Sequence, residues 1–83
     1  MSTERLTLRR ENWPGHPVDL GEGFRLRKRS HEAVCWLRTH ELGWEVVVNV
    51  DGMLQRSQVC RSQDEILTRT EAWKVALMER GWR

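Results

Sequence analysis

The stretch WEVVVNVDGMLQRSQVCRSQDE, residues 44–65, contains a strand, a tight turn, a second strand and the start of a helix in direct succession. Apolar side chains occupy every second position from Trp44 to Val50, which is the period of a strand with one buried face. Asp51-Gly52 then supplies the positive φ angles that a tight hairpin turn requires. This order predicts that the second half of the chain folds as a hairpin followed by a helix.

Both ends of the expected helix are marked in the sequence. Ser62 lies three residues before Glu65, so each side chain can accept a hydrogen bond from the other residue's backbone N–H, an arrangement called a capping box. Gly81 favours the left-handed conformation in which many helices end. The periodicity predicts a helix over 63–80, and its buried stripe should comprise Ile66, Leu67, Thr70, Trp73, Ala76 and Leu77.

The residues before this stretch predict a meander of strands. Apolar and arginine side chains alternate at the start of segment 24–29, and a turn at Ser30-His31 leads into a further strand over 33–38. Short connections of this kind join antiparallel neighbours. We therefore expect an α+β fold, an antiparallel three- to four-stranded meander sheet with one C-terminal α-helix packed on one face.

The loop lengths predict which side chains face the helix. An even-length loop over 40–43 pairs Thr39 with Trp44, so the inner face should comprise Ala33, Cys35, Leu37, Trp44, Val46, Val48 and Val50. Trp73 should pack against Trp44 and the valines. The next turn adds Met53, Gln55, Ser57 and Val59 to the inner face and leaves Leu54, Arg56, Gln58 and Cys60 outside. This last strand is polar on both faces, and a slip of one residue would exchange the two sets.

The first residues of the chain differ from the remainder in composition. They contain an alternating piece over Arg5–Arg9, a loop over 12–17 with both prolines, and Gly21-Glu22-Gly23, which indicates a turn. We expect an N-terminal arm or edge strand plus loop over residues 1–23 and a single α+β domain over residues 24–83. An arm that folds back would cover part of the outer sheet face.

The length and the cysteines limit the class of protein. A chain of 83 residues suits one domain of marginal stability. No apolar run approaches the roughly 18 residues that cross a membrane, and the first ten residues lack the apolar segment of a signal peptide, so we expect a cytoplasmic protein. Cys35 and Cys60 do not have the spacing of a disulfide framework or a zinc knuckle, and both should be reduced and buried.

The expected outer face combines basic and apolar side chains. The net charge of +2 is concentrated in residues 24–61, where seven Lys or Arg residues accompany four Asp or Glu residues. Arginine holds phosphate with a fork of donors, and an exposed tryptophan can stack on a base. The candidate binding face comprises Arg25, Arg27, Arg29, Val34, Trp36, Arg38, Val47, Arg56 and Gln58.

Two functions are compatible with this face. The first is a small non-enzymatic interaction protein, a homodimer or a module that binds another protein, which uses the second sheet face or an edge strand. The alternative is a nucleic-acid-binding module that uses the same arginines together with Trp36. In architecture, three strands followed by a helix over about residues 33–80 resemble the DNA-binding domain of plant ethylene-response factors and the arm-binding domain of phage integrases. The third strand here lacks their cluster of Arg and Trp.

The motifs of catalysis and metal binding are incomplete. His31-Glu32 and His40-Glu41 do not continue into the HExxH pattern that places two metal ligands on one helical face. Ser57 and Ser62 have no matched histidine and acid with which to form a nucleophile and its base. We therefore expect no enzyme activity, no cofactor and no metal site.

Overall fold

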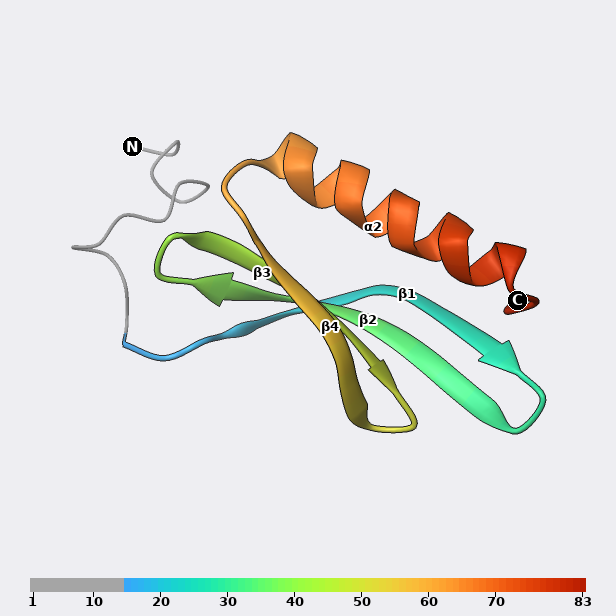
Figure 1. Ribbon diagram of the computed structural model, residues 1–83. Coiled ribbons are helices and arrows are strands. Elements are labelled where there is room, and N and C mark those ends of the chain that lie inside the picture. Colours follow the sequence, from blue (N-terminus) through green and yellow to red (C-terminus); the bar gives the residue numbers. More distant parts are fainter. Residues whose placement is uncertain (1–14) are drawn as a thin grey trace.

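The computed structural model describes residues 15–83, which form a four-stranded antiparallel sheet followed by a helix. The elements are β1 (Asp19–Lys28), β2 (His31–His40), β3 (Gly43–Val50), β4 (Met53–Cys60) and α2 (Gln63–Glu79). The strands lie in the order β1-β2-β3-β4, and α2 lies across one face of the sheet (Figure 1). The expected α+β fold is confirmed, with four strands.

The start of β1 differs from the prediction. The strand begins at Asp19, before Phe24, and it includes Gly21-Glu22-Gly23, so the interpretation of these residues as a turn was wrong. Two register shifts occur along this part of the strand, and β-bulges of this kind accommodate glycine without ending the pairing with β2. The expectations for Arg5–Arg9 and the loop over 12–17 fall largely on residues 1–14, which lie outside the described residues.

The register between β2 and β3 agrees with the loop-length prediction. Thr39 pairs with Trp44, and Cys35 pairs with Val48. Because side chains in a strand alternate between the two faces, this register places Cys35 and Val48 together beneath α2, where both belong to the core.

The β3–β4 hairpin closes as predicted but then leaves the predicted register. Asp51 and Gly52 have the expected positive φ angles, 53° and 82°. An extra residue at Gln55 then forms a bulge, so that Arg56 is the partner of Val48. Each later residue of β4 therefore lies on the opposite face from the one predicted.

Arg56 and Gln58 thus lie on the helix side of the sheet, and their assignment to the outer face was wrong. Ser57 and Val59 take the outer positions. Cys60 also changes face and is completely buried in the core under α2. The bulge therefore removes an apolar side chain from water at the point where β4 leads into the helix, which gives a physical reason for the observed register.

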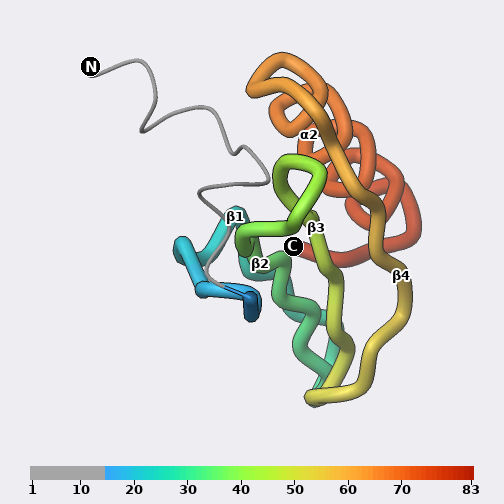
Figure 2. Tube along the Cα trace, turned by 90° about the vertical axis from the view of Figure 1, so that its left-hand side faces the viewer, coloured from blue at the N-terminus to red at the C-terminus, as the bar shows by residue number. Residues whose placement is uncertain are grey.

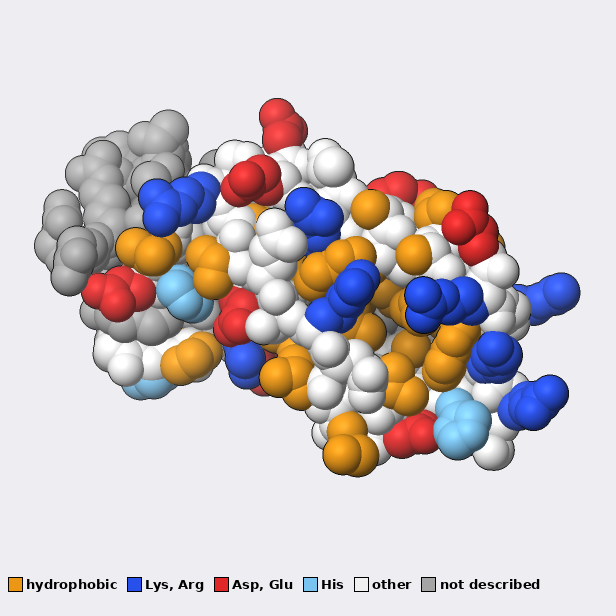
Figure 3. All heavy atoms as spheres, in the orientation of Figure 1, with side chains coloured by type: hydrophobic (Ala, Val, Ile, Leu, Met, Phe, Trp, Pro, Cys, Tyr) orange, Lys and Arg blue, Asp and Glu red, His pale blue; other side chains and the backbone are white. Residues whose placement is uncertain are grey.

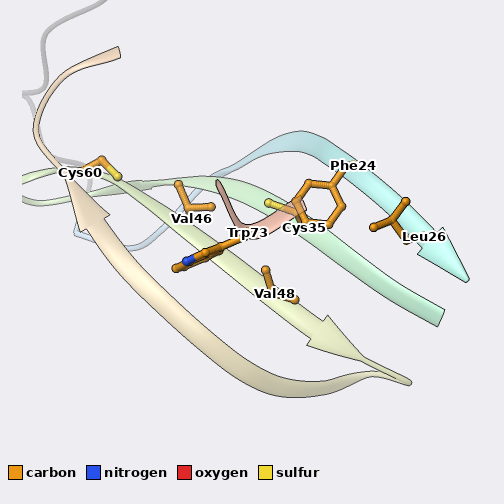
Figure 4. Close-up of a cluster of buried hydrophobic side chains, with 7 residues drawn as sticks. All are labelled: Phe24, Leu26, Cys35, Val46, Val48, Cys60 and Trp73. Carbon is orange, nitrogen blue, oxygen red and sulfur yellow. The ribbon is translucent and has the colours of Figure 1, made fainter. Parts of the chain in front are cut away.

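The core lies between the sheet and α2, and Trp73 occupies its centre (Figure 4). Trp44 is only half-buried and is not part of this cluster, contrary to the prediction. It is the second residue of β3 and pairs with Cys60, three residues before α2 begins, whereas Trp73 lies in the second half of the helix. The buried members are Phe24, Leu26, Cys35, Val46, Val48, Cys60 and Trp73, and Leu37, Ile66, Leu77 and Trp82 pack against them.

The buried stripe of α2 is narrower than predicted. Ile66, Trp73 and Leu77 face the core, but Leu67 is 68% exposed. One residue along a helix corresponds to a rotation of about 100°, which turns Leu67 away from the sheet. Ala76 is also exposed, so both residues were wrongly assigned to the buried stripe.

The predicted N-terminal cap of α2 forms in part. The Ser62 hydroxyl accepts a hydrogen bond from the Glu65 backbone N–H at 3.1 Å. The Glu65 carboxylate accepts its reciprocal bond from the N–H of Arg61, one residue before the position that a capping box requires. Both bonds hold the end of β4 close to the start of the helix.

The helix ends in the manner that Gly81 predicts. Gly81 has a φ of 98°, and its N–H donates to the carbonyl of Met78, while the Trp82 N–H donates to the carbonyl of Leu77. These two bonds are those of a Schellman motif. The turn directs Trp82 back onto the core, as expected for the residue after a glycine stop.

Candidate functional site: an open strand edge and a cationic groove

The outer sheet face carries paired charges. Arg25 forms ion pairs with Glu22 and Glu32, both at 2.7 Å, and Arg27 contacts Glu32 at 3.2 Å. Hydrogen bonds from Arg25 lower the pKa of Glu22, and hydrogen bonds to Glu22 and Glu32 raise the pKa of Arg25. These arginines therefore have carboxylate partners already, which reduces the positive field that a phosphate would meet.

Arg38, at the other end of this face, is also paired with a carboxylate. Its guanidinium donates to the Glu45 carboxylate at 2.9 Å. A hollow of about 190 Å³ lies beside it, lined by Asp19, Trp36, Arg38, Val47 and Asn49. Val47 is only 5% exposed and Trp36 is half-buried, so this part of the face presents less apolar surface than the sequence predicts.

The structure thus brings together six of the nine candidate binding residues. Arg29 lies in the β1–β2 turn with a φ of 57°, and Arg56 and Gln58 lie on the helix side. The six that share the outer face are Arg25, Arg27, Val34, Trp36, Arg38 and Val47.

The two margins of the sheet are β1 and β4 (Figure 2). On β1, the backbone N–H and carbonyl of Arg27 both bond to Arg83, at 2.7 and 2.9 Å. Lys28 adds a hydrogen bond from its ammonium group to the carbonyl of Arg80 at 2.7 Å. The residues after α2 therefore cover part of the β1 margin.

The β4 margin has no strand beside it within the described residues. In an antiparallel ladder, residues alternate between bonding to the neighbouring strand and directing both backbone groups away from it. The turn at Asp51-Gly52 makes Val50 the first bonded residue of β3, so Val47 is not bonded toward β4, nor is its partner Ser57 toward β3. The N–H and carbonyl of Ser57 and, two residues later, of Val59 therefore point outward.

A groove of about 460 Å³ lies between α2 and the ends of β3 and β4 that meet at the Asp51-Gly52 turn. Its basic lining residues are Arg56 and Arg80, and the guanidinium group of Arg56 lies 5.2 Å from the ring centre of Trp73. Figure 3 shows apolar side chains exposed between the helix and the sheet, with basic side chains beside them. The lining comprises Val48, Val50, Gln55, Arg56, Trp73, Ala76, Leu77, Arg80 and Trp82.

The sequence alone did not reveal this groove. Arg56 was assigned to the outer face, and the candidate binding residues included neither Arg80 nor Trp82. The possible one-residue slip of β4 was the signal that could have found it, because that slip puts Arg56 on the same side as Trp73.

The two cysteines are buried and free. Burial raises the pKa of Cys35 to about 11 and also raises the pKa of Cys60. Neither thiol is therefore ready to act as a nucleophile at neutral pH.

Residues 15–83 contain neither a metal-ligand cluster nor a membrane-spanning helix. No cluster of three or more His, Cys, Asp or Glu side chains is placed to hold a metal ion there. In the same residues, no helix is long and apolar enough to cross a membrane. Comparison of the chain with family models, curated proteins and solved structures gives no match.

Proposed function

We propose that this protein is a homodimeric interaction protein that pairs through the outward edge of β4, which has no neighbouring strand within residues 15–83. The observation that carries the proposal is the contrast between the two sheet margins, since Arg83 bonds to β1 while β4 has no described neighbour. Unpaired strand edges are templates for another strand, and a second copy of the same chain offers a matching one.

The geometry of β4 supports an isologous contact. With a two-fold axis at Gln58, the outward backbone groups of Ser57 would meet those of Val59 in the partner, giving four hydrogen bonds in all. Between Arg56 and Arg61 the strand carries no charged side chain and no proline, the usual protections of an edge. The exposed side chain of Leu54 adds apolar surface nearby.

The strength of this contact should be moderate. A net contribution of about 0.5 to 1.5 kcal/mol for each hydrogen bond is small against the cost of association. We therefore expect dissociation in roughly the micromolar range, with burial around the edge supplying the remaining free energy.

Sedimentation over a wide range of concentrations tests the proposal. The mass should rise toward twice 9.9 kDa as concentration increases. Ser57→Pro should keep the protein monomeric, because proline removes an outward N–H that β3 does not use. Ser57→Ala retains that N–H and is the matched control, which should dimerise as the wild type does. A urea curve for each variant separates lost pairing from lost folding.

A second variant distinguishes the β4 edge from the outer sheet face. Trp36→Glu introduces a charge into that face and should leave dimerisation unchanged if β4 is the interface. Loss of the dimer in Trp36→Glu but not in Ser57→Pro would contradict the proposal and identify the outer face as the interface. A monomer at every concentration would contradict both.

A further inference from the structure

We infer that the groove between β4 and α2 is a binding site for a small organic acid, a carboxylate with an apolar body. The groove has the two features that such a ligand needs, an apolar floor and two arginines that form no ion pair within residues 15–83. The inference does not depend on the proposed dimer, because the groove lies on the helix side of the sheet and not on the outward margin of β4.

The charges around the groove favour an anion. Arg56 and Arg80 form no ion pair within residues 15–83, and no Asp or Glu is among the residues that line the groove. The outer face shows that this chain places carboxylates beside arginine elsewhere, as with Glu45 and Arg38. The groove is therefore complementary to a negative charge supplied from outside, and guanidinium groups hold carboxylates with paired donors.

The floor of the groove favours an apolar body. Val48 and Val50 from β3 and Leu77 from α2 line it, and Trp82 lines it as well. A volume of about 460 Å³ is within the range of small-molecule sites, which are mostly apolar with a few polar groups that orient the ligand.

The tryptophan rings argue against a nucleobase as the occupant. Trp73 is 8% exposed, and the Arg56 guanidinium already lies over its ring. A base would need a free aromatic face on which to stack. An aliphatic or small aromatic acid needs only the valine and leucine surface together with the two guanidinium groups.

The experiment compares octanoate with 1-octanol, which has the same chain length without the charge. Each is titrated into the full chain labelled with ¹⁵N, and the indole N–H signals are followed. Octanoate should shift the signals of Trp73 and Trp82, leave that of Trp36 unchanged, and bind about ten-fold or more tightly than octanol, because one charge-assisted contact is worth about that factor.

Three variants assign the charge to its residues. Arg80→Gln should weaken octanoate about five-fold or more without changing octanol binding, and Arg80 is exposed, so the fold should tolerate the change. Arg56→Gln should act in the same direction, although it also removes the contact with Trp73. Arg38→Gln, on the other face, is the matched control and should leave both affinities unchanged.

Several results would overturn the inference. Equal affinity for octanoate and octanol would show that the arginines do not select an anion. A shift confined to Trp36 would place binding on the outer face, and no shift with millimolar octanoate would exclude the site. Sedimentation of the same variants keeps the two proposals distinct, since Arg80→Gln should dimerise as the wild type does.

Discussion

The two edge strands of this sheet are stabilised in different ways. β1 contributes Phe24 and Leu26 to the core, its arginines pair with glutamates, and Arg83 bonds to its outer margin. β4 contributes one buried side chain, Cys60, and the residues from Met53 to Ser57 are all exposed. The margin at β1 is thus held by core packing, ion pairs and backbone hydrogen bonds. The margin at β4 is held mainly by its hairpin with β3 and by the start of α2. Within residues 15–83, the margin of β4 is therefore the one without a neighbouring segment, which is why we propose it for binding.

The largest expected difference between the two edges is in the core. Phe24→Ala should lower the free energy of unfolding by about 3 to 5 kcal/mol, because Phe24 is 8% exposed and its removal leaves a cavity. Met53→Ala is the matched change on β4 and should cost less than about 0.5 kcal/mol, since Met53 is 70% exposed. Urea denaturation measures both. Similar losses in the two variants would contradict the contrast.

The next effect concerns the residues that cover β1. Gly81→Ala should lower the free energy of unfolding by about 1 to 2 kcal/mol, because residue 81 has a φ of 98°, which residues other than glycine rarely adopt. The strained turn should also loosen the bonds between Arg27 and Arg83 and speed amide exchange at Arg27. Urea denaturation and hydrogen exchange measure the two consequences. Unchanged exchange at Arg27 would show that its protection does not depend on Gly81.

At β4, the contact that corresponds to the bonds between Arg83 and β1 is the N-terminal cap of α2. Ser62→Ala should cost about 1 kcal/mol, since it removes the acceptor for the Glu65 N–H. Ser62→Asp retains a capping oxygen and should restore most of the stability. If thermal unfolding showed the alanine variant to be as stable as the wild type, the cap would not secure the end of β4.

The sequence predicted those parts of the fold in which side-chain type and backbone geometry agree. The even-length loop over 40–43 and the alternation around Val46 and Val48 predicted the β2–β3 register, and Asp51-Gly52 predicted the turn between β3 and β4. The bulge at Gln55 could not be predicted, because Gln55 and its polar neighbours have similar preferences for either face. That single extra residue moved Arg56 from one candidate site to another, so the site was less predictable than the fold.

The smallest effect should appear in the acid stability of the β3–β4 hairpin. Hydrogen bonds from His31 and from the Glu32 N–H lower the pKa of Asp51. Because the pKa of Asp51 is lower in the folded protein, its carboxylate stabilises the fold at pH values above its pKa in the unfolded chain, about 3.9. This stabilisation is lost as the pH falls through the pKa of Asp51 in the folded protein. Asp51→Asn can keep the turn, because asparagine tolerates a positive φ. Near neutral pH the variant should have a lower melting temperature than the wild type, and this difference in melting temperature should disappear toward about pH 2. A difference in melting temperature that does not change with pH would show that the Asp51 carboxylate does not stabilise the fold.

The bonds from Arg27 and Lys28 to the residues after α2 have a consequence for folding kinetics. Every strand pair in this meander joins neighbours in the sequence, and such local pairs can form early. The contact between Arg27 and Arg83 instead closes nearly the whole described chain into a loop, whose entropic cost favours late formation. We expect changes at this contact to speed unfolding and leave the refolding rate almost unaltered, so that the covered margin of β1 determines how long the folded state lasts.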